Sequence, residues 1–299
     1  MSRPLRWDIE GRDWPHREAA RVIETRGMAW HVLDMGTGPT LLLLHGTGAS
    51  THSWRGMIEP LANRFRVIAL DLPGHGFTRG RPSGGMGLAG VARAVSQLLE
   101  AKSIEPAMLA GHSAGAAIAL EISRNGRPIP VAGFNPAILP FQGAAAQLFP
   151  ALAKMLFVNP LAPRIFTAMI RSPQDARKFL ERATNSQIDE AGLRCYARLL
   201  GNRHHAEGAL AMMANWDLVA FEKVLPGIDA PVLLIHSDED NAVPLASVEK
   251  AAALLPDAML EVSPGLGHLA HEQAPDRYAA RLIEWARKLD ILAAKEATV

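Results

Sequence analysis

Several features are scarce in this chain, and each absence excludes a class of protein. Its 299 residues include a single cysteine, Cys195, which rules out an internal disulfide framework and fits a reducing compartment. The formal net charge is only +1, so the chain lacks the broad basic field that nucleic-acid binding needs. We therefore expect no nucleic-acid partner.

Long uninterrupted apolar runs are also missing. The first residues, Met-Ser-Arg-Pro-Leu-Arg-Trp-Asp, contain no apolar stretch of the length that a secretory signal requires. The longest apolar tract, residues 137–160, is interrupted by proline, glycine, glutamine and lysine, whereas a membrane-spanning helix needs roughly 20 cleaner residues. We expect no transmembrane segment, and a cytoplasmic protein that starts near Met1.

The composition is that of a globular protein with a large core, since 48% of residues are hydrophobic and 20% are charged. Short apolar runs alternate with helix-like stretches up to about residue 134, which predicts an α/β fold with a mostly parallel sheet. The first two runs predict an antiparallel hairpin at the edge. The expected early strands are 21–25, 28–34, 40–45 and 66–70, and the expected early helices are 53–62 and 88–102.

From Pro136 to about Leu225 the alternation stops and the pattern becomes helical, with prolines that should divide it into short helices. This segment lies between the expected strands 129–134 and 232–236. We therefore predict a core domain of residues 1–135 and 226–299, with residues 136–225 inserted as a helical cap. Open α/β sheets bind ligands beyond the carboxyl ends of their strands, where such a cap would sit.

The most informative motif is Gly111-His-Ser-Ala-Gly115, which follows a buried-strand run and precedes an Ala-rich helical run. A serine at a sharp strand-to-helix turn has strained backbone angles and tolerates only small neighbours, which Gly111 and Gly115 supply. The alternative is a serine that merely caps a helix. The glycines on both sides favour Ser113 as a nucleophile.

A serine nucleophile needs a base and an orienting acid, and the order along this kind of chain is serine, acid, histidine. The strand run 231–236 ends in a carboxylate-rich loop, where Asp240 is favoured over Asp238 by its spacing to the following Val-Pro. Near the C-terminus, the turn Pro-Gly-Leu-Gly leads directly into His268, the expected base. Its rival is His271, three residues later, which we expect to support the loop.

Two backbone amides are the expected oxyanion donors. The run His45-Gly-Thr-Gly48 ends an apolar strand and would offer the amide of Thr47. The amide of Ala114 follows the nucleophile at a helix N-terminus, where the helix dipole favours a developing negative charge.

Together, the His45-Gly-Thr-Gly, Asp71-Leu-Pro-Gly-His-Gly, Gly111-His-Ser-Ala-Gly, Asp240 and Gly267-His268 segments resemble the α/β-hydrolase superfamily over nearly the whole chain. Four stretches resemble the magnesium-chelatase accessory proteins of bacteriochlorophyll biosynthesis in phototrophic bacteria: the extension of the first motif to Arg55, residues 111–118, residues 212–217 and residues 264–272. The resemblance implies an α/β-hydrolase fold, with a mostly parallel, eight-stranded sheet and helices on both faces. It also implies a place in magnesium tetrapyrrole synthesis and an association with magnesium chelatase. No Walker-type loop is present, so the chain is not the ATP-driven motor.

These observations predict a serine hydrolase that cleaves an ester or similar acyl bond of a small apolar substrate, such as a porphyrin or its ester. The alternatives are a tetrapyrrole-binding, chelatase-assisting protein without turnover, and a hydrolase of carbon–carbon bonds or of unrelated carboxylesters. We expect neither a cofactor nor a metal site, because the adjacent His204 and His205 lack a spaced set of carboxylates and magnesium prefers oxygen ligands. The expected substrate contacts are Trp54, Phe134, Met212, Met213 and Trp216.

Overall fold

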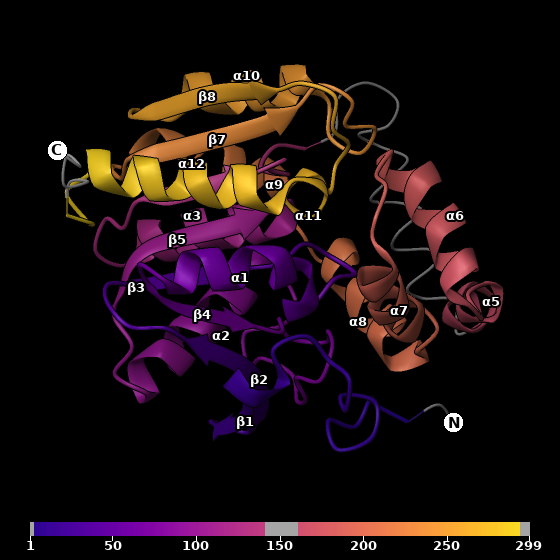
Figure 1. The fold of residues 1–299 in the computed structure, drawn as a ribbon. Coiled ribbons are helices and arrows are strands. Elements are labelled where there is room, and N and C mark those ends of the chain that lie inside the picture. The colour runs from indigo at the N-terminus through magenta and orange to yellow at the C-terminus, as the bar shows by residue number, and fades with distance from the viewer. Residues whose placement is uncertain (1–2, 141–160, 294–299) are drawn as a thin grey trace, which may run out of the picture.

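The computed structural model describes residues 3–140 and 161–293. One eight-stranded sheet runs through the molecule in the order β1-β2-β4-β3-β5-β6-β7-β8 (Figure 1). The strand pairs β1/β2 and β2/β4 are antiparallel, and all later neighbours are parallel. The strands are β1 Ala20–Thr25, β2 Met28–Met35, β3 Thr40–Leu44, β4 Arg66–Leu70, β5 Pro106–His112, β6 Val131–Phe134, β7 Val232–Ser237 and β8 Ala258–Ser263.

The central strands are buried on both faces because their side chains alternate between two cores. On β3, Leu41 and Leu43 join one hydrophobic cluster, and Leu42 and Leu44 join the other. Side chains of α1 and α12 complete the cluster of Leu41 and Leu43, and side chains of α2, α3 and α10 complete the cluster of Leu42 and Leu44. The helices of the core are α1 Arg55–Ala62, α2 Leu88–Ala101, α3 Ala114–Asn125, α10 Leu245–Leu254, α11 Ala270–Gln273 and α12 Pro275–Lys288.

Between β6 and β7 the described residues are helical. The helices α5 to α8, here called the cap helices, stack at the end of the sheet toward which β7 points (Figure 1). Pro163 and Pro173 lie in the first turns of α5 and α6, where proline is tolerated. The cap helices are α5 Ala162–Met169, α6 Pro173–Thr184, α7 Glu190–Leu200 and α8 Arg203–Ala214, and the short α9 Leu218–Glu222 follows them.

Two expected elements begin elsewhere. The helix expected from Ser53 is preceded by a 3-10 turn, η2 Thr51–Trp54, and α1 follows at Arg55. Strand β6 begins at Val131 and not at Ile129, because Pro130 has no N–H and the amide of Ile129 donates to Ser123 Oγ. Residues 141–160 of the long apolar tract lie outside the described residues.

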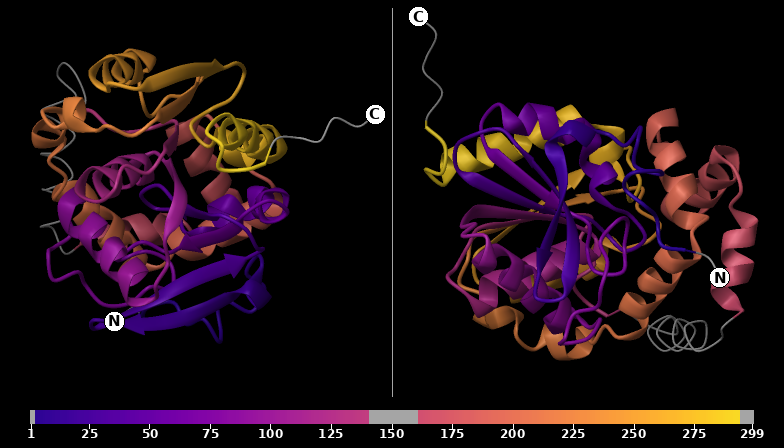
Figure 2. Two further views of the ribbon diagram at one scale, coloured as in Figure 1. Left: turned by 90° about the vertical axis from the view of Figure 1, so that its left-hand side faces the viewer. Right: turned by 90° about the horizontal axis from the view of Figure 1, so that it is seen from below.

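The N-terminal segment lies against the cap helices at the far side of the molecule from the C-terminal end (Figure 2). Trp14 is buried in a cluster with Cys195 and Leu199 of α7 and with Phe77 of the core. The Arg198 guanidinium of α7 pairs with Asp13, with one contact at 2.8 Å. In the described part of the chain, no helix is long and apolar enough to cross a membrane.

Candidate active site

Ser113 lies at the turn between β5 and α3, with φ 52° and ψ −116°. A non-glycine residue rarely adopts a positive φ, so this backbone is strained. The turn needs glycine on either side: a Cβ on Gly111 would lie 2.3 Å from the Gly115 carbonyl, and one on Gly115 would lie 2.0 Å from the Leu44 carbonyl oxygen. Ser113 occupies the N-cap position of α3, yet its side chain makes no capping hydrogen bond and it is partly exposed. Helix capping does not explain this serine.

The expected acid and base are in direct contact. His268 Nδ1 donates to Asp240 Oδ2 across 2.7 Å. With its proton on Nδ1, a neutral His268 ring presents a free lone pair at Nε2, as a general base requires. Asp238 instead accepts from the Gly265 amide and is exposed.

Asp240 is held as a carboxylate by several donors. Its Oδ1 accepts from the amides of Ala242 and Val243 at 2.7 and 3.0 Å, and its Oδ2 also accepts from Asn135 Nδ2 at 2.8 Å. Burial alone would raise the pKa of Asp240, but the hydrogen bond and charge of His268, together with the Val243 and Asn135 donors, lower it below its usual value. The acid therefore stays ionised at neutral pH.

The expected oxyanion loop lies against Ser113. A Cβ on Gly46 would come within 3.1 Å of Ser113 Cβ, so Gly46, the neighbour of Thr47, approaches the serine closely. Within the described residues, neither the Thr47 amide nor the Ala114 amide donates a hydrogen bond to the protein. Two free amides beside a serine are what an oxyanion site requires.

His112 ties the serine turn to the histidine loop. Its ring Nε2 donates to the carbonyl of His268 at 3.0 Å, and burial is the main reason that its pKa lies well below the usual value. His112 is therefore neutral, and it links the serine turn to the histidine loop by this hydrogen bond. His271 does not contact Asp240 in the described structure: its Nε2 donates to Ser53 Oγ at 2.8 Å, in agreement with a supporting role.

A buried polar network between α7 and the core has no local signature in the sequence. Glu272 accepts from Ser53 Oγ at 2.7 Å, from the Tyr196 hydroxyl at 2.6 Å and from Arg55. Burial lowers the pKa of Arg55, but the charges and hydrogen bonds of Glu272 and Asp189 together outweigh burial and raise this pKa above its usual value. Because Tyr196 belongs to α7, this network joins the cap to the core.

A second set of contacts joins the cap to the loops around the serine. His205 of α8 is buried; its Nδ1 accepts from the Gly76 amide and its Nε2 donates to the Gly48 carbonyl, both at 3.0 Å. The hydroxyl of Thr47 lies 3.4 Å from Met212 Sδ. At the last residue of α6, the Thr184 carbonyl accepts from the His268 amide at 2.8 Å. Cap residues thus contact both the oxyanion loop and the histidine loop.

The five expected substrate contacts are not brought together. Trp54 and Phe134 pack in the core cluster on the α1 and α12 face, with ring centroids 6.0 Å apart, and both are fully buried. Met212 and Trp216 pack with the opposite cluster, while Met213 is 44% exposed. Their role as substrate contacts stays a prediction.

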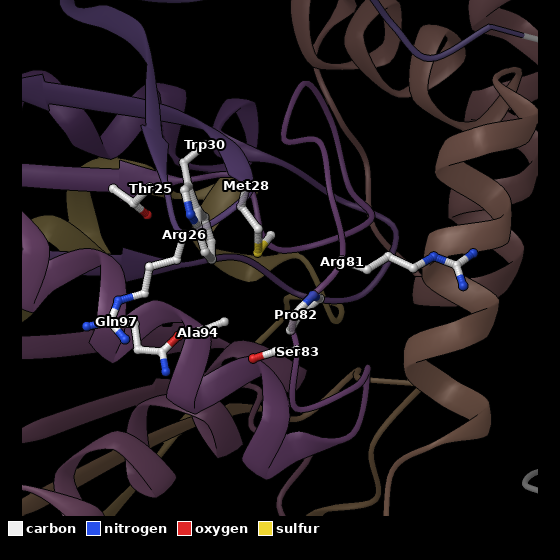
Figure 3. A pocket seen from close by; sticks show the side chains of 9 residues that line it. All are labelled: Thr25, Arg26, Met28, Trp30, Arg81, Pro82, Ser83, Ala94 and Gln97. Atoms are coloured by element: carbon white, nitrogen blue, oxygen red, sulfur yellow. The ribbon is translucent and has the colours of Figure 1, made fainter.

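Two hollows lie away from Ser113. A cavity of about 100 Å³ is formed by the β1–β2 turn, the 81–83 loop and α2, and Arg81 points away from its other side chains (Figure 3). An open groove of about 400 Å³ lies between β8 and α12 and includes Ser263 and Tyr278. No group of three or more metal-ligating side chains occurs among residues 3–140 and 161–293.

Comparison with known proteins agrees with this architecture. Residues 41–281 match the model of the alpha/beta hydrolase family. The "Magnesium-chelatase 30 kDa subunit" of Rhodobacter capsulatus is 41% identical over 276 residues, which cover 91% of this chain and 96% of that protein. Haloalkane dehalogenase 2 of Mycobacterium tuberculosis is 28% identical over 265 residues, covering 85% of this chain and 90% of its own.

Among solved structures, a putative lipase from Acinetobacter baumannii has the same fold, with a TM-score of 0.75 at 19% identity over 97% of this chain and 98% of its own. The family match spans the parallel part of the sheet from Leu41 of β3 to β8, the serine turn and the expected acid and histidine. The chain therefore belongs to the alpha/beta hydrolase family.

Proposed function

We propose that this protein is a serine hydrolase that cleaves an ester or similar acyl bond of an apolar substrate. The observation that carries the proposal is the 2.7 Å hydrogen bond from His268 Nδ1 to Asp240 Oδ2. It fixes the ring tautomer that a base for a serine hydroxyl needs. Ser113 is then the nucleophile, His268 the base and Asp240 the acid that orients it.

In the proposed reaction, Ser113 Oγ attacks the substrate carbonyl while His268 Nε2 takes the hydroxyl proton. The amides of Thr47 and Ala114 stabilise the negative charge that develops on the carbonyl oxygen. His268 then returns its proton to the leaving alcohol, and the acyl group remains on Ser113 as an ester. Water attacks that ester in the same manner and regenerates the serine.

The apolar character of the substrate is inferred from the cap. We propose that residues 136–225 form a cap over Ser113, because Met212 of α8 contacts the expected oxyanion loop and both α7 and α8 make hydrogen bonds to the core. A porphyrin or its ester has the apolar surface that methionine and tryptophan side chains accommodate. Trp54, Phe134, Met213 and Trp216 remain candidate contacts in this proposal.

Covalent labelling tests the chemistry directly. A fluorophosphonate probe should modify the purified protein, and mass spectrometry should place the adduct on Ser113. Ser113→Ala should abolish labelling, and should lower kcat on any accepted p-nitrophenyl ester by about 10³-fold or more. Labelling of another serine, or none in a folded protein, would contradict the assignment.

A second candidate function is assistance to magnesium chelatase without turnover, in bacteriochlorophyll biosynthesis. The 41% identity to a protein named as a magnesium-chelatase subunit favours it. Protoporphyrin binding, followed by quenching of tryptophan fluorescence, should be equal in the wild type and Ser113→Ala if the protein acts only by binding. If Ser113→Ala also loses its effect on chelatase activity in a reconstituted assay, turnover is required.

A further inference from the structure

The oxygen of Asp240 that holds His268 has a second partner, Asn135, at the end of β6. Asn135 Nδ2 donates to Asp240 Oδ2 at 2.8 Å, so two donors converge on one oxygen. Asn135 is fully buried, and its backbone N–H donates to the Ile235 carbonyl at 2.8 Å. An amide donor at this place restricts the directions from which Oδ2 can accept the proton of His268.

The orientation of Asn135 is itself determined by a hydrogen-bond chain. Ser237 Oγ donates to Asn135 Oδ1 at 3.2 Å, which identifies the oxygen and nitrogen of the amide. Ser237 has one hydroxyl proton, and that proton is used on Asn135. The Tyr278 hydroxyl, 3.2 Å away, therefore donates to Ser237. The chain runs in one direction, from Tyr278 through Ser237 and Asn135 to Asp240.

The first two members of this hydrogen-bond chain, Tyr278 and Ser237, belong to a helix and a strand. Tyr278 lies on α12, which runs beside β7 (Figure 1), and its side chain is 1% exposed. Ser237 ends β7 and is fully buried. The other charged or titratable neighbour of Asp240 is His236, whose Nδ1 lies 3.9 Å from Oδ2 in the described structure and makes no hydrogen bond there.

We propose that Asn135 is a positioning residue for the acid and base, and that Ser237 and Tyr278 determine its orientation. The inference rests on the proposed function. Asn135 acts through Asp240 and need not touch the substrate: it keeps Oδ2 directed at His268 Nδ1, so that the ring does not lose its orientation between proton transfers.

Asn135 also has a backbone role, which the variants must separate from this one. Its φ is 45°, a conformation that asparagine and glycine tolerate. Asn135→Gly therefore keeps the backbone conformation and removes only the side chain. Ser237→Ala removes the donor that orients Asn135 and leaves Asp240 with all of its direct partners.

The sheet provides a matched control for Ser237→Ala. Ser263 is the cross-strand partner of Ser237 on β8 and is also buried, but its hydroxyl has no hydrogen-bond partner in the described structure. Ser263→Ala removes a hydroxyl from the neighbouring position and leaves the hydrogen-bond chain from Tyr278 to Asp240 intact. A general effect of deleting a buried hydroxyl would appear in both serine variants.

Two measurements test the proposal. The first is the low-field proton NMR resonance of His268 Nδ1–H, assigned by its loss in His268→Gln, which reports the bond to Asp240 without any substrate. The second is the rate of fluorophosphonate labelling of Ser113. Asn135→Gly should broaden or abolish the resonance and slow labelling by about tenfold or more. Ser237→Ala should do the same to a smaller extent, and Ser263→Ala should change neither.

A sharp, unshifted resonance in folded Asn135→Gly and Ser237→Ala would overturn the proposal, as would an equal effect of Ser263→Ala. If Asn135→Gly does not fold, the comparison of Ser237→Ala with Ser263→Ala tests the proposal. The two measurements also separate the two proposals. A wild type that is not labelled at Ser113 contradicts the hydrolase function, while the resonance still decides the role of Asn135.

Discussion

Asp240 and His268 meet across 2.7 Å, although 28 residues separate them, while Asp238 turns outward to the amide of Gly265. The two aspartates are only two residues apart, yet one is held by four donors and the other is exposed. The difference arises because the chain folds back at Asp240, whose Oδ1 accepts the amides of Ala242 and Val243. This local turn orients the Asp240 carboxylate independently of the histidine loop.

Asp240→Asn should therefore disable the proposed reaction without unfolding the protein. An amide at this position offers a donor where His268 also has one, so the ring must adopt the wrong tautomer or orientation. We expect kcat on a p-nitrophenyl ester to fall on the order of 10⁴-fold. Asp238→Asn is the matched control and should retain kcat. Equal losses in the two variants would contradict the assignment of the acid.

The parts of the fold that could be predicted from sequence are those set by local pattern. The leucine-rich strand β3, the Gly-His-Ser-Ala-Gly turn and the Gly-rich turn before His268 each contain their own signal, and the structure has a strand or turn in each place. Contacts between distant segments have no such signal. Asn135 reaches Asp240 across 105 residues and His205 reaches Gly48 across 157, and neither pairing shows any spacing or periodicity.

Backbone strain at Ser113 predicts an unusual pair of variants. Ser113→Gly should raise the free energy of unfolding by about 1 kcal/mol, because glycine adopts φ near 50° without a clash. Ser113→Ala keeps the Cβ and should leave stability close to that of the wild type. Both variants remove the hydroxyl, so both should lose labelling. Only Ser113→Gly should gain stability, which would separate the role of the hydroxyl from the effect of backbone strain. Urea unfolding measures the difference.

The close packing of α8 on the core depends on two glycines, Gly74 and Gly208. A Cβ on Gly208 would lie 1.9 Å from the Gly74 carbonyl oxygen, so Gly208→Ala must push α8 away from the 71–76 loop. We expect a loss of about 1–3 kcal/mol in stability and slower labelling of Ser113, because His205 and Met212 contact the oxyanion loop from the same helix. Gly227→Ala is the control, since no atom lies within 4 Å of a Cβ there. An unchanged labelling rate in Gly208→Ala would show that α8 does not support the loop.

The buried histidine of α8 should make stability depend on pH. Burial lowers the pKa of His205 to about 4 from its usual 6.5, and the ring is neutral while it accepts from Gly76 and donates to Gly48. Between these two values the unfolded chain binds a proton that the folded protein does not. The free energy of unfolding should therefore fall as pH drops from about 6.5 to about 4, by about 1.4 kcal/mol per pH unit for this group.

His205→Gln tests this contribution, because glutamine can donate to one carbonyl and accept from one amide without titrating. Its free energy of unfolding is measured by urea denaturation at several pH values between 6.5 and 4. As pH drops, this free energy should fall less steeply than that of the wild type, and the difference in slope should correspond to about one proton. His204→Gln is the matched control, since His204 is the adjacent residue and is exposed. Other buried histidines, His52 and His75 among them, keep a residual slope in both variants because burial also lowers their pKa values. If His205→Gln keeps the wild-type dependence of unfolding free energy on pH, His205 is already protonated in the folded protein. It then does not accept a hydrogen bond from the Gly76 amide.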